Sequence, residues 1–111
     1  MQLMIDGRSK QVPTIRESVA KILTLCANIA MTPVEDGRSE YVADDGYTIT
    51  QIIKESHIVL HTQGDWINFD LFSCKWFFVS EVVRFFQEAF NIVEIRNIQI
   101  LQRPFGIGKE T

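Results

Sequence analysis

Apolar and polar residues alternate along several short segments of the chain, as they do in β-strands with one buried face. The alternation is clearest over residues 66–72, where Ile67, Phe69 and Leu71 fall on one side and polar residues fall between them. The pattern predicts strands over residues 2–5, 47–53, 57–62, 66–72 and 92–101, and a further strand that begins within 32–34.

Two other segments repeat apolar residues every three or four positions, which is the period of an amphipathic helix. The first follows Thr14, and Thr14 with Glu17 three residues later forms a capping-box pattern. Its apolar stripe consists of Ile15, Val19, Ile22, Leu23, Cys26 and Ile29. A second helix is predicted over residues 76–90, and its stripe consists of Val79, Val82, Val83, Phe86, Ala89 and Phe90.

The tetrapeptide Asp-Gly-Arg-Ser occurs twice, at residues 6–9 and 36–39. Because Asp-Gly is a common turn pair, both copies are predicted to be turns. Further turns are predicted at residues 44–46 and 63–65, which also combine Asp with Gly. The tail at residues 103–111 is predicted to be loosely held.

These elements predict an α+β fold within a single domain over residues 1–111. Hairpin-length turns between the central strands favour an antiparallel sheet. Two amphipathic helices on one face of that sheet give a two-layer sandwich. The other sheet face would carry Trp66, Asn68 and Asp70, and the second helix has aromatic residues on more than one side. Both features favour a homodimer.

The overall composition excludes several classes of protein. Hydrophobic residues make up 46% of the chain and charged residues 23%, as in ordinary globular proteins. Eleven Lys and Arg against fourteen Asp and Glu give a net charge of −3, which argues against a nucleic-acid partner. No apolar run approaches the roughly 20 residues of a membrane helix, and the N-terminus turns polar too early for a signal peptide. We therefore expect a soluble, cytoplasmic protein.

Neither a disulfide framework nor a metal site is expected. Cys26 and Cys74 are the two cysteines, and no Cys-x-x-Cys pair exists for zinc. His57 and His61 are four residues apart in a predicted strand, which separates them by about 13 Å. The two thiols are expected to be reduced.

Residues suited to nucleophilic and proton-transfer chemistry gather around two predicted strands. Ser56, His57 and His61 lie in or beside the strand at 57–62, and Cys74 follows the next strand. Taken singly, each has an ordinary structural explanation, such as a turn serine or a buried cysteine. Their combination is what points to a function.

The combination resembles the short prokaryotic type of S-adenosylmethionine decarboxylase. The matching residues are Glu55-Ser56-His57-Ile58, His61-Thr62 and Phe69-Asp70-Leu71-Phe72-Ser73-Cys74. The family has Gly-x-Ser ahead of these residues, where this chain has Gly46-Tyr47-Thr48. The resemblance is best over residues 46–74 and extends to both ends through the order of elements.

The resemblance implies a proenzyme that cleaves itself between Glu55 and Ser56 into chains 1–55 and 56–111. The serine hydroxyl would attack the carbonyl before it, and the resulting ester would break by β-elimination. Ser56 would thereby become a pyruvoyl group, a covalent cofactor that draws electrons from the substrate as CO₂ leaves. The small-molecule substrate would be S-adenosylmethionine, in the synthesis of spermidine and related polyamines.

The resemblance also assigns roles to three further residues. The Thr48 hydroxyl is a candidate donor to the oxygen of the scissile carbonyl. His61 is the candidate base for the elimination, because imidazole titrates near neutral pH. Cys74 is the candidate acid that reprotonates the substrate carbon.

The chain departs from the family at substrate recognition. The aromatic residue that stacks on adenine in the family falls beside Tyr41, and the family's Trp-Pro-Glu is replaced by Gln63-Gly64-Asp65. Tyr41 and Asp65 are accordingly the predicted substrate-binding residues.

These departures leave two alternatives open. One is a pyruvoyl-dependent decarboxylase of ornithine or arginine, in which Asp44, Asp45 or Asp65 pairs with the distal cation of the substrate. The other is an unprocessed, non-catalytic partner subunit of an active paralogue.

Overall fold

The computed structural model describes residues 1–102, and the predicted loose tail at 103–111 lies outside the described residues. The strands are β1 (Gln2–Ser9), β2 (Pro33–Ala43), β3 (Gly46–Ile53), β4 (Ser56–Gln63), β5 (Trp66–Ser73) and β6 (Ile92–Leu101). The helices are α1 (Ile15–Asn28) and α2 (Val79–Ala89).

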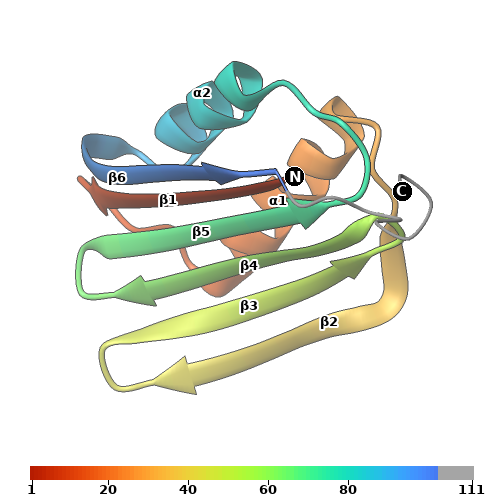
Figure 1. The fold of residues 1–111 in the computed structure, drawn as a ribbon. Coiled ribbons are helices and arrows are strands. Elements are labelled where there is room, and N and C mark those ends of the chain that lie inside the picture. Colours follow the sequence, from red (N-terminus) through yellow and green to blue (C-terminus); the bar gives the residue numbers. More distant parts are fainter. Residues whose placement is uncertain (103–111) are drawn as a thin grey trace.

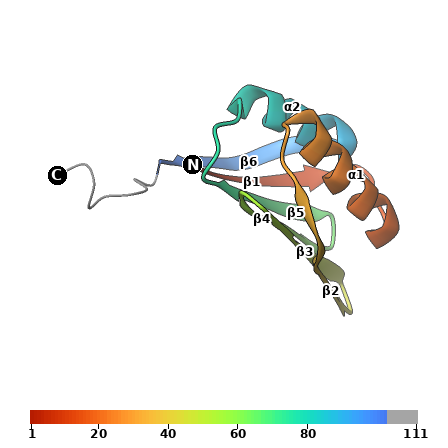
Figure 2. The same ribbon diagram turned by 90° about the vertical axis from the view of Figure 1, so that its right-hand side faces the viewer.

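The strands form one six-stranded sheet in the order β2-β3-β4-β5-β1-β6 (Figure 1). Every neighbouring pair is antiparallel. Both helices pack on the same face of the sheet (Figure 2). The predicted α+β arrangement is therefore confirmed. Neither of the described helices is long and apolar enough to cross a membrane.

The core lies between this sheet face and the two helices. Alternate residues of the central strands are fully buried there, among them Ile49 of β3, Leu60 of β4 and Phe69 of β5. The helices contribute Ile22 of α1 and Phe86 of α2. Because side chains alternate along a strand, the residues between these point to the opposite face, which we call the open face. It carries His57, Val59, His61, Trp66, Asn68 and Asp70.

Both Asp-Gly-Arg-Ser copies lie inside strands, so the turns predicted for them were wrong. In the first copy, the pairing of β1 with β6 shifts between Asp6 and Gly7. A Cβ atom at Gly7 would lie 2.9 Å from Cγ2 of Ile92, so glycine allows close packing there rather than a turn. The second copy lies in β2, where the pairing with β3 shifts between Pro33 and Arg38. The sequence pattern marked two irregular strands.

Helix α1 begins as the capping box predicts. The Thr14 hydroxyl accepts a hydrogen bond from the backbone N–H of Glu17, and the Glu17 carboxylate accepts one from the N–H of Thr14. These hydrogen bonds lower the pKa of Glu17. The predicted stripe was wrong at Leu23, which is exposed, while Leu25 is buried.

Helix α2 begins at Val79, three residues later than predicted. Phe78 is extended and precedes the helix without a side-chain capping hydrogen bond. Of the three consecutive aromatic residues Trp76, Phe77 and Phe78, only Phe77 enters the core, whereas Trp76 and Phe78 are 73% and 77% exposed. The run is therefore a connecting segment, and two of its rings are free to contact something else.

Candidate active site

The Glu55–Ser56 peptide lies at the two-residue turn that joins β3 to β4. Three hydrogen bonds hold this turn. The N–H of Lys54 donates to the Thr32 carbonyl at 2.8 Å, and the N–H of Thr32 donates to the Glu55 carboxylate at 3.0 Å. The N–H of Cys74 donates to the carbonyl oxygen of Glu55 at 3.0 Å. Segments that lie well before and well after the turn in the sequence thus fix the predicted scissile bond.

Cys74 owes its position to the buried residue before it. Ser73 is fully buried, and its hydroxyl bonds to the backbone of Lys75, which shapes the chain as it leaves β5. The N-terminal amine of Met1 donates to the Ser73 carbonyl at 2.7 Å. The Cys74 side chain is exposed, so the thiol is accessible beside the scissile bond.

Cys26 is buried and has a different character. Burial, and then the negative charge of Glu55, raise the pKa of the Cys26 thiol to about 11. Cys26 therefore stays a neutral thiol at physiological pH, and its side chain is part of the hydrophobic core.

Thr48 and His61 are brought together as a pair. The Thr48 hydroxyl and Nδ1 of His61 lie 2.7 Å apart, and the two residues face each other across β3 and β4. The motif residues next to this pair, Gly46 and Tyr47 on β3 and Thr62 on β4, fit this register closely. A Cβ atom at Gly46 would collide with the Thr62 carbonyl oxygen, and the Thr62 hydroxyl accepts the N–H of Tyr47 at 2.9 Å.

Ser56 is not near this pair within one chain. Ser56 faces the buried residues Ile53 and Ser73 across the ladder, so it belongs to the helix-covered side of the sheet. His61 lies on the open face, five residues further along β4, at a separation of about 16 Å. The predicted contact of Thr48 and His61 with the scissile bond is therefore not made inside a single chain.

The predicted substrate-binding residues lie with the Thr48–His61 pair and not with Ser56. Tyr41 faces Thr48 across β2 and β3 and is largely exposed. Asp65 lies in the turn between β4 and β5, at the far end of β4 from Ser56. That end is about 23 Å from the scissile bond.

The sequence interpretation missed two features near the scissile bond. It gave the Glu55 side chain no role, although its carboxylate holds Thr32. It also gave little weight to His57, which directly follows Ser56 and whose ring packs against Phe72 with centroids 5.5 Å apart. His57 is signalled only by its adjacency to Ser56.

The profile of the family described as S-adenosylmethionine decarboxylase matches residues 8–103. The chain belongs to this family. Its membership supports a decarboxylase function, and the matched span includes every site residue named above from Thr32 to Cys74. No curated protein matches the chain.

A pyruvoyl group, on which S-adenosylmethionine decarboxylases generally depend, fits the residues present. Its precursor would be Ser56, and the carbonyl that Ser56 must attack already accepts a hydrogen bond from Cys74. Within residues 1–102, no group of three or more His, Cys, Asp or Glu side chains gathers to hold a metal ion.

Proposed function

We propose that the protein is a self-cleaving, pyruvoyl-dependent S-adenosylmethionine decarboxylase that acts in polyamine synthesis. The observation that carries the proposal is the 3.0 Å hydrogen bond from the Cys74 N–H to the Glu55 carbonyl oxygen. A donor at this oxygen polarises the carbonyl and stabilises the negative charge that develops when a nucleophile attacks it. The nearest hydroxyl along the chain is that of Ser56.

The proposed cleavage proceeds in three steps. Oγ of Ser56 bonds to the Glu55 carbonyl carbon and the C–N bond breaks, which gives an ester and a free amine at Ser56. A base removes the Ser56 α-proton, and Glu55 leaves as a carboxylate. Water then replaces the amine of the dehydroalanine, which releases ammonia and leaves the pyruvoyl group.

The pyruvoyl carbonyl would supply the electron-withdrawing group that decarboxylation of an amino acid requires. The chain's own residues hold it in place and move protons. Cys74 follows the strand that pairs with Ser56 and has an exposed side chain, which supports its proposed role as proton donor to the substrate carbon.

The geometry also favours the homodimer. The open face is uncovered in one chain (Figure 2), and it mixes polar residues with exposed Ile52. If a second copy packs on it with its strands reversed, the end of one sheet that holds the β4–β5 turn meets the Ser56 end of the other. His61 of the partner subunit could then approach the scissile bond that its own chain leaves about 16 Å away.

The first test is the intact mass of the purified protein. Self-cleavage should give two fragments, each about half of the 12.8 kDa chain, and the fragment that starts at position 56 should begin with an α-keto group. Release of CO₂ from S-adenosylmethionine, ornithine and arginine then distinguishes the substrates. A single chain after long incubation at neutral pH would instead support the non-catalytic subunit.

Removing the Glu55 carboxylate is expected to slow self-cleavage. Glu55→Ala loses the hydrogen bond from Thr32, and a bond to a charged group contributes roughly 1.5–3 kcal/mol, so cleavage should slow about tenfold or more. Glu55→Gln keeps an oxygen acceptor and should restore most of the rate. The measurement is fragment formation over time by mass spectrometry. Equal cleavage by wild-type and alanine chains would remove Glu55 from this positioning role.

Two substitutions at Cys74 are expected to separate its backbone from its side chain. Cys74→Ala keeps the N–H that bonds Glu55, so the chain should cleave but release CO₂ at least tenfold more slowly. Cys74→Pro lacks the N–H and should cleave poorly even where thermal unfolding shows a folded chain. Full turnover by the alanine variant would show that the thiol takes no part.

A further inference from the structure

The Thr48–His61 pair on the open face has a second pair of residues beside it on the helix-covered side. Tyr47 precedes Thr48 in β3, and Thr62 follows His61 in β4, so both point to the opposite face from their neighbours. Thr62 is buried, and Tyr47 packs against the hydrophobic core. A shift of Tyr47 or Thr62 would therefore also move the neighbouring residue on the open face.

The Thr62 hydroxyl joins β4 to β3 where the backbone pairing stops. At this end of the two strands, the register runs no further than Thr48 and His61. At the next position, the Thr62 hydroxyl accepts the N–H of Tyr47 at 2.9 Å and donates to the Tyr47 carbonyl at 3.4 Å. Removing this buried hydroxyl would leave the Tyr47 N–H without the acceptor that the fold gives it.

The Tyr47 side chain anchors the same end of β3 to the start of α1. Its hydroxyl donates to the Pro13 carbonyl at 2.6 Å, so its oxygen accepts from the Ser18 hydroxyl at 2.7 Å. Ser18 is fully buried. Burial raises the pKa of Tyr47, which keeps its hydroxyl protonated and able to donate. One side chain thus joins the two layers of the fold directly beside Thr48.

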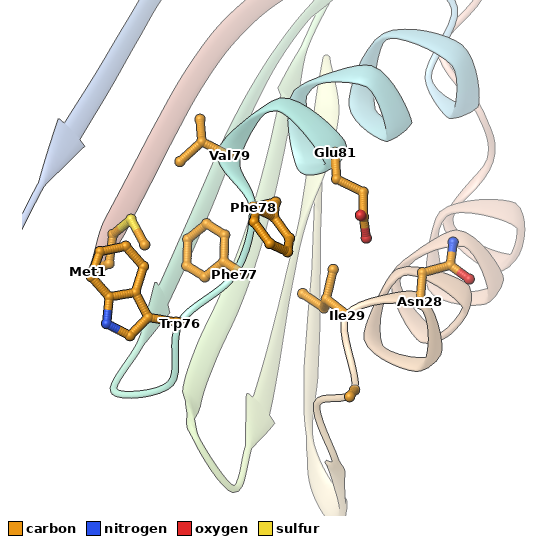
Figure 3. Close-up of a pocket in the computed structure, with 9 residues that line it drawn as sticks. Met1, Asn28, Ile29, Trp76, Phe77, Phe78, Val79 and Glu81 are labelled. Atoms are coloured by element: carbon orange, nitrogen blue, oxygen red, sulfur yellow. The ribbon is translucent and has the colours of Figure 1, made fainter.

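The other end of α1 borders a cavity of about 520 Å³. Its walls include Ile29, Phe77 and Phe78 (Figure 3). Side chains that line a cavity lose packing contacts, so this end of α1 holds the sheet less firmly. The hydrogen bonds of Tyr47 at the start of α1 are accordingly well placed to fix β3 relative to the helix.

We propose that Tyr47 and Thr62 are positioning residues that hold the Thr48–His61 pair in the geometry needed to remove the Ser56 α-proton. The proposal rests on the proposed function, in which His61 is the base, and adds to it what holds the base in place. Small displacements of a reacting group cost much of its rate. Loss of either anchor should therefore slow the elimination and leave formation of the ester unchanged.

Hydroxylamine separates these two steps. Its nitrogen bonds to the acyl carbon of the Glu55–Ser56 ester and the C–O bond breaks, which leaves a hydroxamate at Glu55 and a free serine at position 56, without a base for the α-proton. In its absence, Tyr47→Phe and Thr62→Val should form the α-keto fragment about tenfold more slowly than the wild type. In its presence, both variants should split at the wild-type rate, as measured by mass spectrometry.

Three further variants control this experiment. Thr62→Ser keeps the hydroxyl and should restore most of the rate. Thr24→Val should behave like the wild type, because the exposed Thr24 bonds to Ala20 within α1. Ser18→Ala removes one partner of Tyr47 and should give a smaller loss of the same kind, even where Tyr47→Phe does not fold. Equal losses with and without hydroxylamine, or no loss in either step, would overturn the positioning role.

The ring of His61 decides the proposal even if the chain does not cleave. In the Ser56→Ala chain, at a pH where the ring is neutral, NMR of the His61 nitrogens should show one tautomer, because Nδ1 bonds to Thr48. Adding Tyr47→Phe or Thr62→Val should move these shifts toward those of free histidine and leave His57 unchanged. Such movement beside an uncleaved wild-type chain would contradict the proposed function but not the positioning. Unchanged His61 shifts in both variants would overturn the positioning, whatever the mass of the wild-type chain.

Discussion

Replacing Ser56 with alanine is expected to leave the chain at its full 12.8 kDa and to abolish decarboxylation. The N–H of Cys74 would still polarise the Glu55 carbonyl, but no hydroxyl would remain at position 56 to attack it. Without the ester, no pyruvoyl group forms, so the loss of activity should be complete rather than partial. Intact mass after incubation at neutral pH measures the cleavage, and CO₂ release measures the activity.

Ser80→Ala is the matched control for this variant, because Ser80 is an exposed serine of α2 outside the site. It should cleave and decarboxylate like the wild type. Thermal unfolding of the Ser56→Ala chain should show a folded protein, since the pairing of Ser56 with Ile53 and Ser73 in the sheet is made by the backbone, which alanine keeps. Cleavage that persists in the Ser56→Ala variant would refute self-processing at this position.

Much of the fold follows from local sequence signals. The Thr14 capping box places the start of α1, and the alternation over residues 66–72 gives β5 and its buried face. The turn predicted at residues 6–9 was wrong because close packing and turns both select glycine. A side chain at Gly7 would crowd Ile92 of β6, which is remote from it in the sequence, and nothing local distinguishes that requirement from a turn.

The site was predictable in its members but not in its arrangement. The five-residue step from Ser56 to His61 already implies opposite sheet faces, because side chains alternate along a strand. The hydrogen bond from the Thr32 N–H to the Glu55 carboxylate joins two segments that only the folded sheet brings together. The exposure of Trp76 and Phe78 was not predicted, because the helical period was extended back to Trp76. In the structure, Phe78 is extended and α2 begins after it.

Mixing two inactive chains is expected to restore cleavage in only one of them. His61→Ala should not complete cleavage alone, because the α-proton of Ser56 has no base, and Ser56→Ala cannot form the ester. Within a heterodimer, the Ser56→Ala chain still provides His61 to its partner. The His61→Ala chain should therefore be cut after the two variants are unfolded and refolded together, while the Ser56→Ala chain stays whole.

The two chains differ in mass, so mass spectrometry of the refolded mixture shows which of them is cut. The matched control replaces His61→Ala with His57→Ala, whose missing ring directly follows Ser56 on the same strand. If His57 is the base within one chain, His57→Ala should stay intact alone and in every mixture, and His61→Ala should be cut without help. That outcome would contradict a site shared between two chains, because cleavage would then need neither His61 nor a second subunit to supply it. If instead the His61→Ala chain is cut only after refolding with Ser56→Ala, and His57→Ala is cut without a partner, the base lies on the open face of the partner's sheet. Reversed strands in a two-fold dimer supply that position.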